Sequence, residues 1–569
     1  MFRILLASLC MAAINVDESL GAERNPPTPY KVGRSVVMAP HGMVATSHPL
    51  AAQVGLDILK SGGNAIDAAI ATNAAIGLME PMSCGVGGDL FVIVWDAKTQ
   101  KLYGLNANGK APAKATRRYF ADKGLDEIPA TGPLSWSVPG CVDGWDQLRK
   151  KFGTLSFEKI LEPSIQYAEK GFPVSEVIAG YWRGAEGRRS DPDFAKVYLL
   201  GDDRHAPRAG EVFKNPSLAT CYREIAKDGR DAFYKGRIAR SLVGFSEKHG
   251  GLFSMEDLKT QTSVWVEPVK TSYRGHDIWE LPPPGQGISV LQMLNVLEGY
   301  DIKKMGPASP DYWHLLVESK KLAYADRAKF YADPEFAKVP VAELIGKPYA
   351  DERRKLIDAN KALTNLEAGD PKLGKSDTIY LCVVDKDRNC VSMIQSNYFG
   401  FGSGLAPADL GFAIQNRGTL FSLDEKHANR LEPGKRPFHT IIPAMVTKDG
   451  KPLFTFGVMG GDMQPQGHVQ VLINMIDFGM NVQQAGEAPR VEHTGSATPT
   501  GRLGARNGGT IHAEEGLSPD IVKDLIRRGH RVDWVKKNGG GYQGIWVDSA
   551  NGILHGGSES RKDGAAVGY

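Results

Sequence analysis

The stretch GKSDTIYLCVVDKDRNCVSMIQS, residues 374–396, decides the fold. A polar run ends at Asp377, and two apolar segments separated by a short polar turn then predict a β-hairpin that begins at Thr378. A threonine hydroxyl is a weak nucleophile near neutral pH unless a base lies beside it. One such base is the α-amino group of the same residue when that residue heads a chain. A free α-amine has a pKa of about 7.7 to 8.0, so a large fraction of it is unprotonated near neutral pH and can accept a proton. Since a residue in mid-chain has no free α-amine, we expect the peptide bond between Asp377 and Thr378 to be cut.

A glycine turn supplies the second feature that such chemistry needs. Negative charge develops on the attacked carbonyl, and adjacent backbone N–H groups are suited to stabilise it. Gly460 and Gly461 follow the predicted strand PLFTF in GVMGGDMQ. By spacing alone each of these features is weak, and ordinary hairpin punctuation is the favoured explanation of the threonine and the two glycines.

Composition excludes several classes of function. The net charge is +3, with 23% charged and 42% hydrophobic residues, which is typical of a soluble globular protein and predicts no nucleic-acid partner. None of the six cysteines forms a Cys-x-x-Cys pair, and no histidine lies in a His-Glu-x-x-His pattern, so we expect no metal site. Cys382 and Cys390 flank the hairpin turn but do not face each other, which predicts packed thiols rather than a disulfide.

The N-terminus resembles a short export signal. Residues 1–22 contain one basic residue, an apolar run and small residues ending at Ala22, which predicts a periplasmic or secreted protein. A cytoplasmic protein with an N-terminal extension is the alternative. Since no later segment has eighteen uninterrupted apolar residues, we expect no membrane span.

The remaining pattern predicts one α+β unit. Ser47 is expected to cap a helix that starts at Pro49, and Asn64 to cap an all-round apolar, buried helix over 65–79. Strands are expected at 90–95 and 101–106, mainly helical structure over about 116–372, and strands again from Asp377. No internal repeat or low-complexity linker divides the chain.

Two apparent motifs fail on their context. GLNANGKA, residues 104–111, has the spacing of a phosphate-binding loop, but Ala111 replaces the required Ser/Thr and Pro112 stands where a helix should begin. His439 suggests a Ser/His/Asp triad, but the chain contains no Gly-x-Ser-x-Gly elbow to supply the serine.

Several stretches together resemble the gamma-glutamyltransferase family. They are HPLAAQVGLDILKSGGNAIDAAIATNAAIGLMEPMSCGVGGDLF, LPPPGQGISVLQMLNVLEGYD, DTIYLCVVDKDRNCV, GKRPFHTIIPAMV, GVMGGDMQPQGHVQV and the terminal DGAAVGY. The resemblance runs in order from about residue 36 to the C-terminus.

The resemblance implies a four-layer αββα sandwich of the N-terminal-nucleophile hydrolase type, with no cofactor. It implies a proenzyme cut into a large subunit, residues 23–377, and a catalytic small subunit, residues 378–569, which stay associated. Thr378 is carried over as the nucleophile and Gly460 with Gly461 as the oxyanion hole. Ser396 occupies the position of a hydroxyl residue that hydrogen-bonds the nucleophile.

The departures from the family pattern affect the substrate. Asn108 stands where an arginine normally binds the substrate α-carboxylate, and Leu420 where an aspartate normally binds its α-amino group. His439 and Thr440 replace a serine pair, and the loop from 422 to 433 is shorter than the usual lid. The substrate-binding residues expected from the resemblance and from this region are Asn108, Lys110, Asn416, Arg417, His439 and Thr440, of which Lys110 and Arg417 are candidates for a carboxylate.

Three functions follow as hypotheses. The leading one is an amidohydrolase or acyltransferase for gamma-glutamyl compounds such as glutathione, with hydrolysis favoured because a short lid admits water. The second is an acylase for another small carboxylated amide, of the glutaryl or oxamate type, since two charged clamps are lost. The third, of a different class, is an uncut scaffold that only binds.

Overall fold

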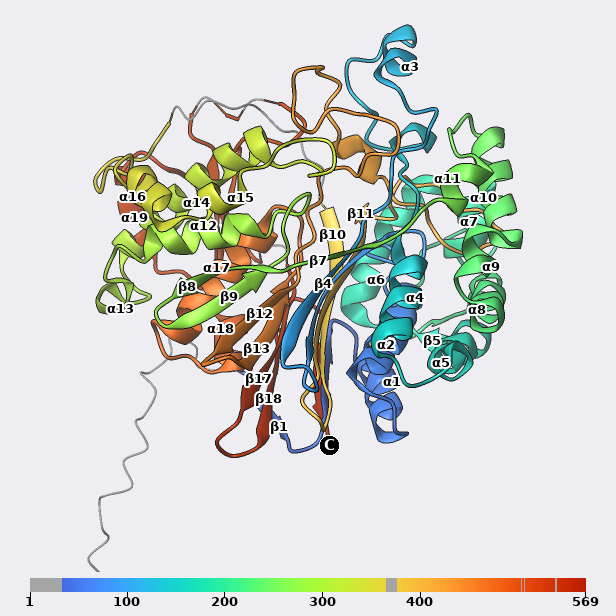
Figure 1. The fold of residues 1–569 in the computed structure, drawn as a ribbon, viewed down its shortest axis with the longest axis horizontal. Helices are drawn as coiled ribbons and strands as arrows, with labels where there is room; N and C mark the ends of the chain where they lie inside the picture. Colours follow the sequence, from blue (N-terminus) through green and yellow to red (C-terminus); the bar gives the residue numbers. More distant parts are fainter. Residues whose placement is uncertain (1–32, 365–375, 503, 506, 538–539) are drawn as a thin grey trace, which may run out of the picture.

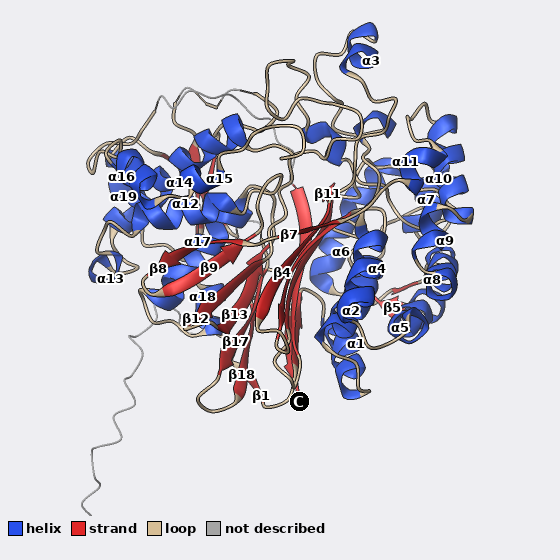
Figure 2. Ribbon diagram, viewed as in Figure 1, coloured by secondary structure: helices blue, strands red, loops and turns tan. Residues whose placement is uncertain are grey.

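Two stacked β-sheets form the centre of the molecule, and helices cover the outer face of each sheet (Figure 1; Figure 2). The computed structural model describes residues 33–364, 376–502, 504–505, 507–537 and 540–569. The predicted export signal lies outside these residues. Within them, every helix is too short or too polar to cross a membrane. The predicted α+β class and αββα layering are confirmed.

Each sheet has seven antiparallel strands, and both combine strands from before and after residue 377. The first sheet has the order β1 (Val37–Ala39), β18 (Ile553–Ser558), β17 (Tyr542–Asp548), β13 (Lys451–Val458), β12 (Ala444–Lys448), β9 (His276–Glu280), β8 (Val269–Tyr273). The second has the order β19 (Ala565–Gly568), β2 (Met43–Thr46), β10 (Ser376–Val384), β11 (Cys390–Phe399), β3 (Asp89–Asp96), β4 (Lys101–Ala107), β7 (Val264–Val266). The mainly helical stretch before Asp377 therefore also contributes three strands, β7 to β9.

Strand β10 shows why the hairpin sequence is apolar on both faces. Leu381 and Val383 pack into the helical layer, whereas Tyr380 and Cys382 point into the core between the two sheets. Side chains alternate along a strand, so a central strand buried on both faces reads as a continuous apolar run.

One helical layer covers the second sheet, and its apolar side chains form a single cluster with the strands. Its members are α1 (Pro49–Lys60), α2 (Ala65–Met79), α4 (Cys141–Phe152), α5 (Phe157–Lys170), α6 (Glu176–Trp182), α7 (Pro192–Tyr198), α8 (Pro216–Asp228), α9 (Arg230–Tyr234), α10 (Arg237–Lys248) and α11 (Met255–Lys259), with the small hairpin β5 (Phe172–Pro173) and β6 (Val212–Phe213).

The other helical layer covers the first sheet. Its members are α12 (Ile288–Leu297), α13 (Ile302–Met305), α14 (Pro310–Phe330), α15 (Val341–Leu344), α16 (Lys347–Arg354), α17 (Met463–Ile476), α18 (Val482–Glu487) and α19 (Pro519–Arg527), with a small sheet of β14 (Val491–Thr494), β15 (Thr510–Glu514) and β16 (Arg531–Val535). The remaining elements are α3 (Arg117–Asp122) and the 3-10 helices η1 (Pro133–Ser135), η2 (Arg183–Arg188) and η3 (Arg417–Leu420).

Local predictions near the N-terminus are confirmed with one correction. Helix α2 has the predicted bounds, all of its residues are buried, and Asn64 caps it in a reciprocal pair with Asp67. Ser47, however, is not the cap of α1, because its hydroxyl is bonded to Glu80. His48 takes the capping position, and its Nδ1 accepts from the Leu50 N–H at 3.3 Å.

The hairpin cysteines are confirmed as free, buried thiols. Cys382 lies opposite Ser392 and Cys390 lies opposite Val384, so the two sulfurs do not face each other across the pair of strands.

Candidate active site

Thr378 lies at a β-bulge. Asp377 pairs with Tyr398 and Ile379 pairs with Gln395, so Thr378 alone opposes two residues of β11. Bulges of this kind re-aim side chains and are frequent beside active sites. Strand β10 starts at Ser376, two residues earlier than the sequence predicts, because the chain already pairs with β11 there.

The bulge brings two buried hydroxyls together. Thr378 Oγ1 donates to Ser396 Oγ at 3.3 Å, and Ser396 Oγ accepts from the Tyr398 N–H at 2.8 Å. Both Thr378 and Ser396 are fully buried. Ser396 is therefore not an ordinary exposed strand serine, and its hydroxyl is held by the backbone in contact with the nucleophile candidate.

Gly460 and Gly461 form a tight turn between β13 and α17. Their φ angles are 109° and 57°, values that favour glycine. The two carbonyls accept from the N–H groups of Met463 and Gln464, at 3.0 and 3.2 Å. Within the described residues neither glycine N–H donates to a protein acceptor. Two such donors at a helix N-terminus can stabilise an oxyanion.

The glycine turn and the bulge belong to one neighbourhood. Tyr398 lies opposite Asp377 in the strand pair. The charges of Asp462 and Arg327 act on the Tyr398 hydroxyl, and Asp462 is the residue directly after Gly461. The strands that carry the two features, β10 and β13, also face each other across the inter-sheet core, where Tyr380 packs on Gly457.

Arg417 is a buried cation beside this neighbourhood. Its Nη1 donates to Thr440 Oγ1 at 2.7 Å, and its guanidinium lies 4.5 Å from the centre of the Tyr398 ring. Nε and Nη2 are buried and have no hydrogen-bond partner among the described residues. Burial lowers the pKa of Arg417 to about 10, which leaves it charged at neutral pH. A buried guanidinium with two unused N–H groups is suited to a carboxylate.

His439 is half of a buried polar pair. Its Nδ1 accepts from the Ile441 N–H at 3.2 Å, so the proton lies on Nε2, which donates to Asp89 Oδ2 at 3.2 Å. Asp89 Oδ1 accepts from the Gln415 amide at 2.8 Å and from two backbone N–H groups. Burial raises the pKa of Asp89 to about 7. Burial and the charge of Arg417 hold the pKa of His439 well below its usual value.

The residues at the altered clamp positions are also buried. The Asn108 amide donates to the Pro437 carbonyl at 2.8 Å, and its oxygen has no protein partner among the described residues. Leu420 belongs to the apolar core with Phe438, so a substrate ammonium group would find no counter-charge there.

Lys110 and Asn416 differ in their surroundings. Burial lowers the pKa of the half-buried Lys110, and the charges acting on it are those of Arg436, Glu335 and Asp333. Asn416 donates to the Ala130 carbonyl at 2.6 Å and accepts from the Phe399 N–H at 3.1 Å. Its amide therefore fixes the end of β11.

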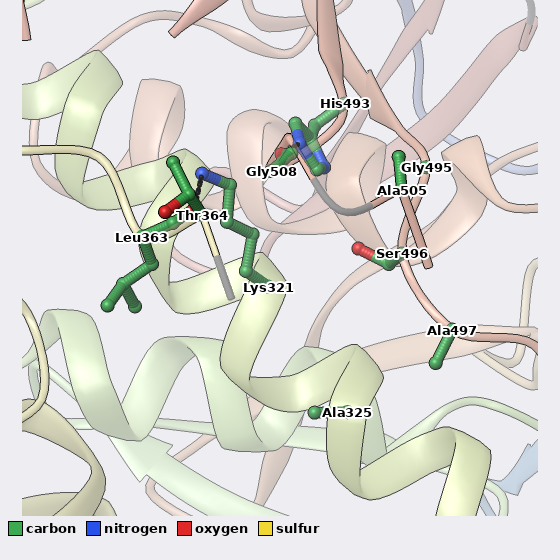
Figure 3. A pocket seen from close by; sticks show the side chains of 10 residues that line it. All are labelled: Lys321, Ala325, Leu363, Thr364, His493, Gly495, Ser496, Ala497, Ala505 and Gly508. Carbon is green, nitrogen blue, oxygen red and sulfur yellow. Dashed lines mark hydrogen bonds between the residues drawn. The ribbon is translucent and has the colours of Figure 1, made fainter. Parts of the chain in front are cut away.

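A cluster of metal-type ligands lies between α14 and the residue that precedes β16, but its surroundings do not suit a cation. His314, Glu318 and His530 are buried with their ligand atoms within 4.8 Å of one another. The Lys321 ammonium lies 2.8 Å from the same Glu318 oxygen that faces His530. Lys321 also donates to the Leu363 carbonyl at 2.9 Å (Figure 3). The cluster thus anchors the chain just before residue 365.

Sequence reasoning missed Asp89, Gln286, Arg327 and Asp462. Each is a polar residue buried or largely buried among apolar neighbours. No pattern in the sequence singled them out, because Arg327, for example, lies in LAYADRAKF beside other charged residues.

Comparisons with known proteins identify the family of this chain. The gamma-glutamyltranspeptidase family model matches residues 51–569. The glutathione hydrolase-like YwrD proenzyme of Bacillus subtilis (strain 168) is 38% identical over 534 residues, covering 92% of this chain and 98% of that protein. The acylase ACY 1 proenzyme of Pseudomonas sp. (strain SE83) is 36% identical, covering 92% and 93%. The crystal structure of cephalosporin acylase from Bacillus halodurans has a TM-score of 0.87 at 43% identity, covering 96% of this chain and 99% of that chain.

The fold is thus that of an N-terminal-nucleophile hydrolase. The chain belongs to the gamma-glutamyltranspeptidase family and is an enzyme.

Proposed function

We propose that this protein is an autoprocessing amidohydrolase whose nucleophile is Thr378. The single observation that carries the proposal is the bulge that holds Thr378 Oγ1 against the Ser396 hydroxyl at 3.3 Å. Cleavage between Asp377 and Thr378 would free the α-amine that serves as the base. The names of the relatives, which are proenzymes, support a cut precursor.

The two products of the cut would stay together. The second sheet interleaves β2, β3 and β4 of the large part with β10, β11 and β19 of the small part. Separating them would break the pairing of β10 with β2 and of β11 with β3. The subunits 23–377 and 378–569 are therefore expected to form one body.

The proposed reaction uses Thr378, its α-amine freed by the cut, and the glycine turn. Thr378 Oγ1 attacks the amide carbonyl, its own α-amine takes the hydroxyl proton, and the Gly460 and Gly461 N–H groups stabilise the oxyanion. Collapse passes that proton to the leaving nitrogen and leaves an ester on Thr378. Water attacks the ester while the α-amine again takes a proton, and the free acid departs. An amine in place of water would give transfer.

Gamma-glutamyl compounds such as glutathione are the leading substrates by family membership. The named relatives, a glutathione hydrolase-like proenzyme and an acylase, differ in substrate. Hydrolysis is favoured over transfer because the segment from 422 to 433 is a short loop rather than a long lid.

A second candidate substrate is a small amide with a carboxylate on its acyl group and no ammonium, of the glutaryl or oxamate type. The observation that favours it is the Arg417 guanidinium, whose Nη1 donates to Thr440 while Nε and Nη2 have no hydrogen-bond partner among the described residues, combined with Leu420 in the place of an anionic clamp. A zwitterionic gamma-glutamyl group would bury its ammonium group beside Leu420 without a partner, which costs free energy. An acyl group without an ammonium avoids this cost.

Mass spectrometry of purified protein tests the proposal. Two chains, the smaller beginning at Thr378, are expected, together with turnover of an acyl-p-nitroanilide. A single uncut chain without activity would favour the non-catalytic scaffold. Rates on gamma-glutamyl-, glutaryl- and pentanoyl-p-nitroanilide and on oxamate then separate the substrate candidates.

A further inference from the structure

The side-chain amide of Gln286 bridges the Gly460–Gly461 turn and Thr440. Thr440 and Arg417 are called the acyl side of the site below, because they are the proposed binding residues for the acyl group. Gln286 is fully buried just before α12. Its Nε2 donates to the Gly461 carbonyl at 2.9 Å and to the Thr440 carbonyl at 2.6 Å. Its Oε1 accepts from Arg327 Nη1 at 2.5 Å. Every polar atom of the amide is therefore used.

Arg327 fixes which way this amide points. A flipped Gln286 amide would aim its oxygen at two carbonyls and its NH₂ group at a guanidinium, which pairs acceptor with acceptor and donor with donor. Arg327 is fully buried and carries only donors. The observed orientation of the Gln286 amide therefore gives a hydrogen-bond partner to the Gly461 carbonyl, to the Thr440 carbonyl and to Arg327 Nη1.

Arg327 also grips the residue that follows the glycine turn. Its Nη1 and Nη2 donate to the two carboxylate oxygens of Asp462, at 2.7 and 3.3 Å. The Asp462 carbonyl accepts from Tyr324 and Gln466, at 2.5 and 2.9 Å. Helix α14, which carries Tyr324 and Arg327, thus holds both the side chain and the backbone of Asp462.

The glycine turn needs such external support. Glycine populates positive and negative φ almost equally, so Gly460 and Gly461 resist a peptide flip poorly by themselves. A flip of either peptide would turn an N–H away from the position where the oxyanion develops. The Gly461 N–H belongs to the Gly460–Gly461 peptide, whose carbonyl accepts from the Met463 N–H at 3.0 Å. The bonds to the Gly461 carbonyl and to Asp462 fix the next peptide, Gly461–Asp462, and so hold the C-terminal side of the turn from outside it.

We propose that Gln286, oriented by Arg327, is a positioning residue that holds the Gly460–Gly461 turn in register with Thr440, so that the oxyanion donors and the acyl side of the site stay aligned. This inference rests on the proposed function, because it assumes that the turn stabilises the oxyanion formed at Thr378. Neither side chain is assigned a contact with the substrate.

Single-turnover kinetics on an acyl-p-nitroanilide test this role. Gln286→Met keeps the side-chain length but removes all three bonds. We expect its acylation rate per processed molecule to fall about 10- to 100-fold, somewhat less than the loss of an oxyanion donor itself, with KM within about threefold. Arg327→Lys retains the charge and one contact, and should keep more of the rate than Arg327→Met.

The matched control is Gln292→Met. Gln292 is also a buried glutamine of this segment, and it bonds to Asp326 and Tyr331 rather than to the turn. We expect a similar decrease in melting temperature, because the lost bonds are of the same kind. The acylation rate should stay within about twofold of wild type, because none of these bonds reaches the glycine turn.

Two outcomes separate the inference from the proposed function. If wild type is uncut and inactive, the proposed function fails. If wild type is cut and active, but Gln286→Met matches Gln292→Met in rate, only the inference fails. Should Gln286→Met remain uncut, Arg327→Met, which removes the bonds to Gln286 and Asp462, gives the deciding comparison with Gln292→Met, and an equal rate would again overturn the inference.

Discussion

The nucleophile side and the acyl side of the site differ in how they relate to the family pattern. On the proposed nucleophile side, Thr378 lies at a bulge beside Ser396, and the N–H groups of Gly460 and Gly461 have no acceptor among the described residues. On the proposed acyl side, Asn108 and Leu420 stand where the resemblance implies charged clamps, and Arg417, which is bonded to Thr440, is the proposed replacement. The difference teaches that bond chemistry tolerates little change in geometry, whereas recognition can be rebuilt from other side chains.

The largest expected effect is on the nucleophile side. Thr378→Ala should abolish both cleavage and turnover, because no hydroxyl remains to attack either carbonyl. Thr378→Ser should still be cut. Mass spectrometry and p-nitroanilide release measure the two effects. A Thr378→Ala variant that is cut and active would show that Thr378 is not the nucleophile, and the contrast between the two sides of the site would then fail.

The next effect is on the acyl side. Arg417→Met should lower the preference for glutaryl- over pentanoyl-p-nitroanilide about 100-fold, since each lost charge-assisted bond contributes about 1.5 to 3 kcal/mol. Arg417→Lys should be intermediate, because an ammonium cannot offer the same paired donors.

The comparator acyl group makes this result interpretable. It has the same length but no carboxylate, so a structural defect would lower both rates equally. Equal losses on the two substrates would mean that Arg417 does not bind a carboxylate.

A smaller effect is expected at Ser396. Ser396→Ala removes the hydroxyl that contacts Thr378 and the Tyr398 N–H. We expect about a tenfold lower rate per processed molecule, which corresponds to the loss of about one hydrogen bond. Ser396→Thr keeps the hydroxyl and should stay near wild type. A rate unchanged in the Ala variant would make Ser396 a packing residue only.

The smallest effect is a dependence of inhibitor binding on pH. Asp89, whose pKa burial raises to about 7, is ionised above that pH and offsets the Arg417 charge, and below it takes up a proton. His439 stays neutral throughout because its pKa lies well below its usual value. The inhibition constant of glutarate should therefore fall, by about three- to tenfold, as the pH drops from 8.5 to 6.5.

Asp89→Asn provides the control for this titration. It lacks the proton uptake and should bind glutarate with little dependence on pH over the same interval. A glutarate affinity that weakens as the pH falls would show that Asp89 and Arg417 do not act on the same ligand.

The sequence predicted most of the scaffold because local rules govern it. Helix α2 is apolar all round and carries its own cap at Asn64, so its bounds follow from the pattern. The cap of α1 did not follow, since the Ser47 hydroxyl is taken by Glu80, a residue 33 positions away. The start of β10 differed for a similar reason, because pairing with β11 extends the strand back to Ser376.

The sequence by itself determined the class of the enzyme and the identity of its candidate nucleophile, because short motifs in one order specify a shared chain path. Only the tertiary structure decided what surrounds them: the buried guanidinium of Arg417, the Asp89–His439 pair, and the amide of Gln286 between the glycine turn and Thr440. The physical reason is that these contacts join residues that are tens to hundreds of positions apart. Their energies come from burial, and burial is a property of the folded chain rather than of any segment.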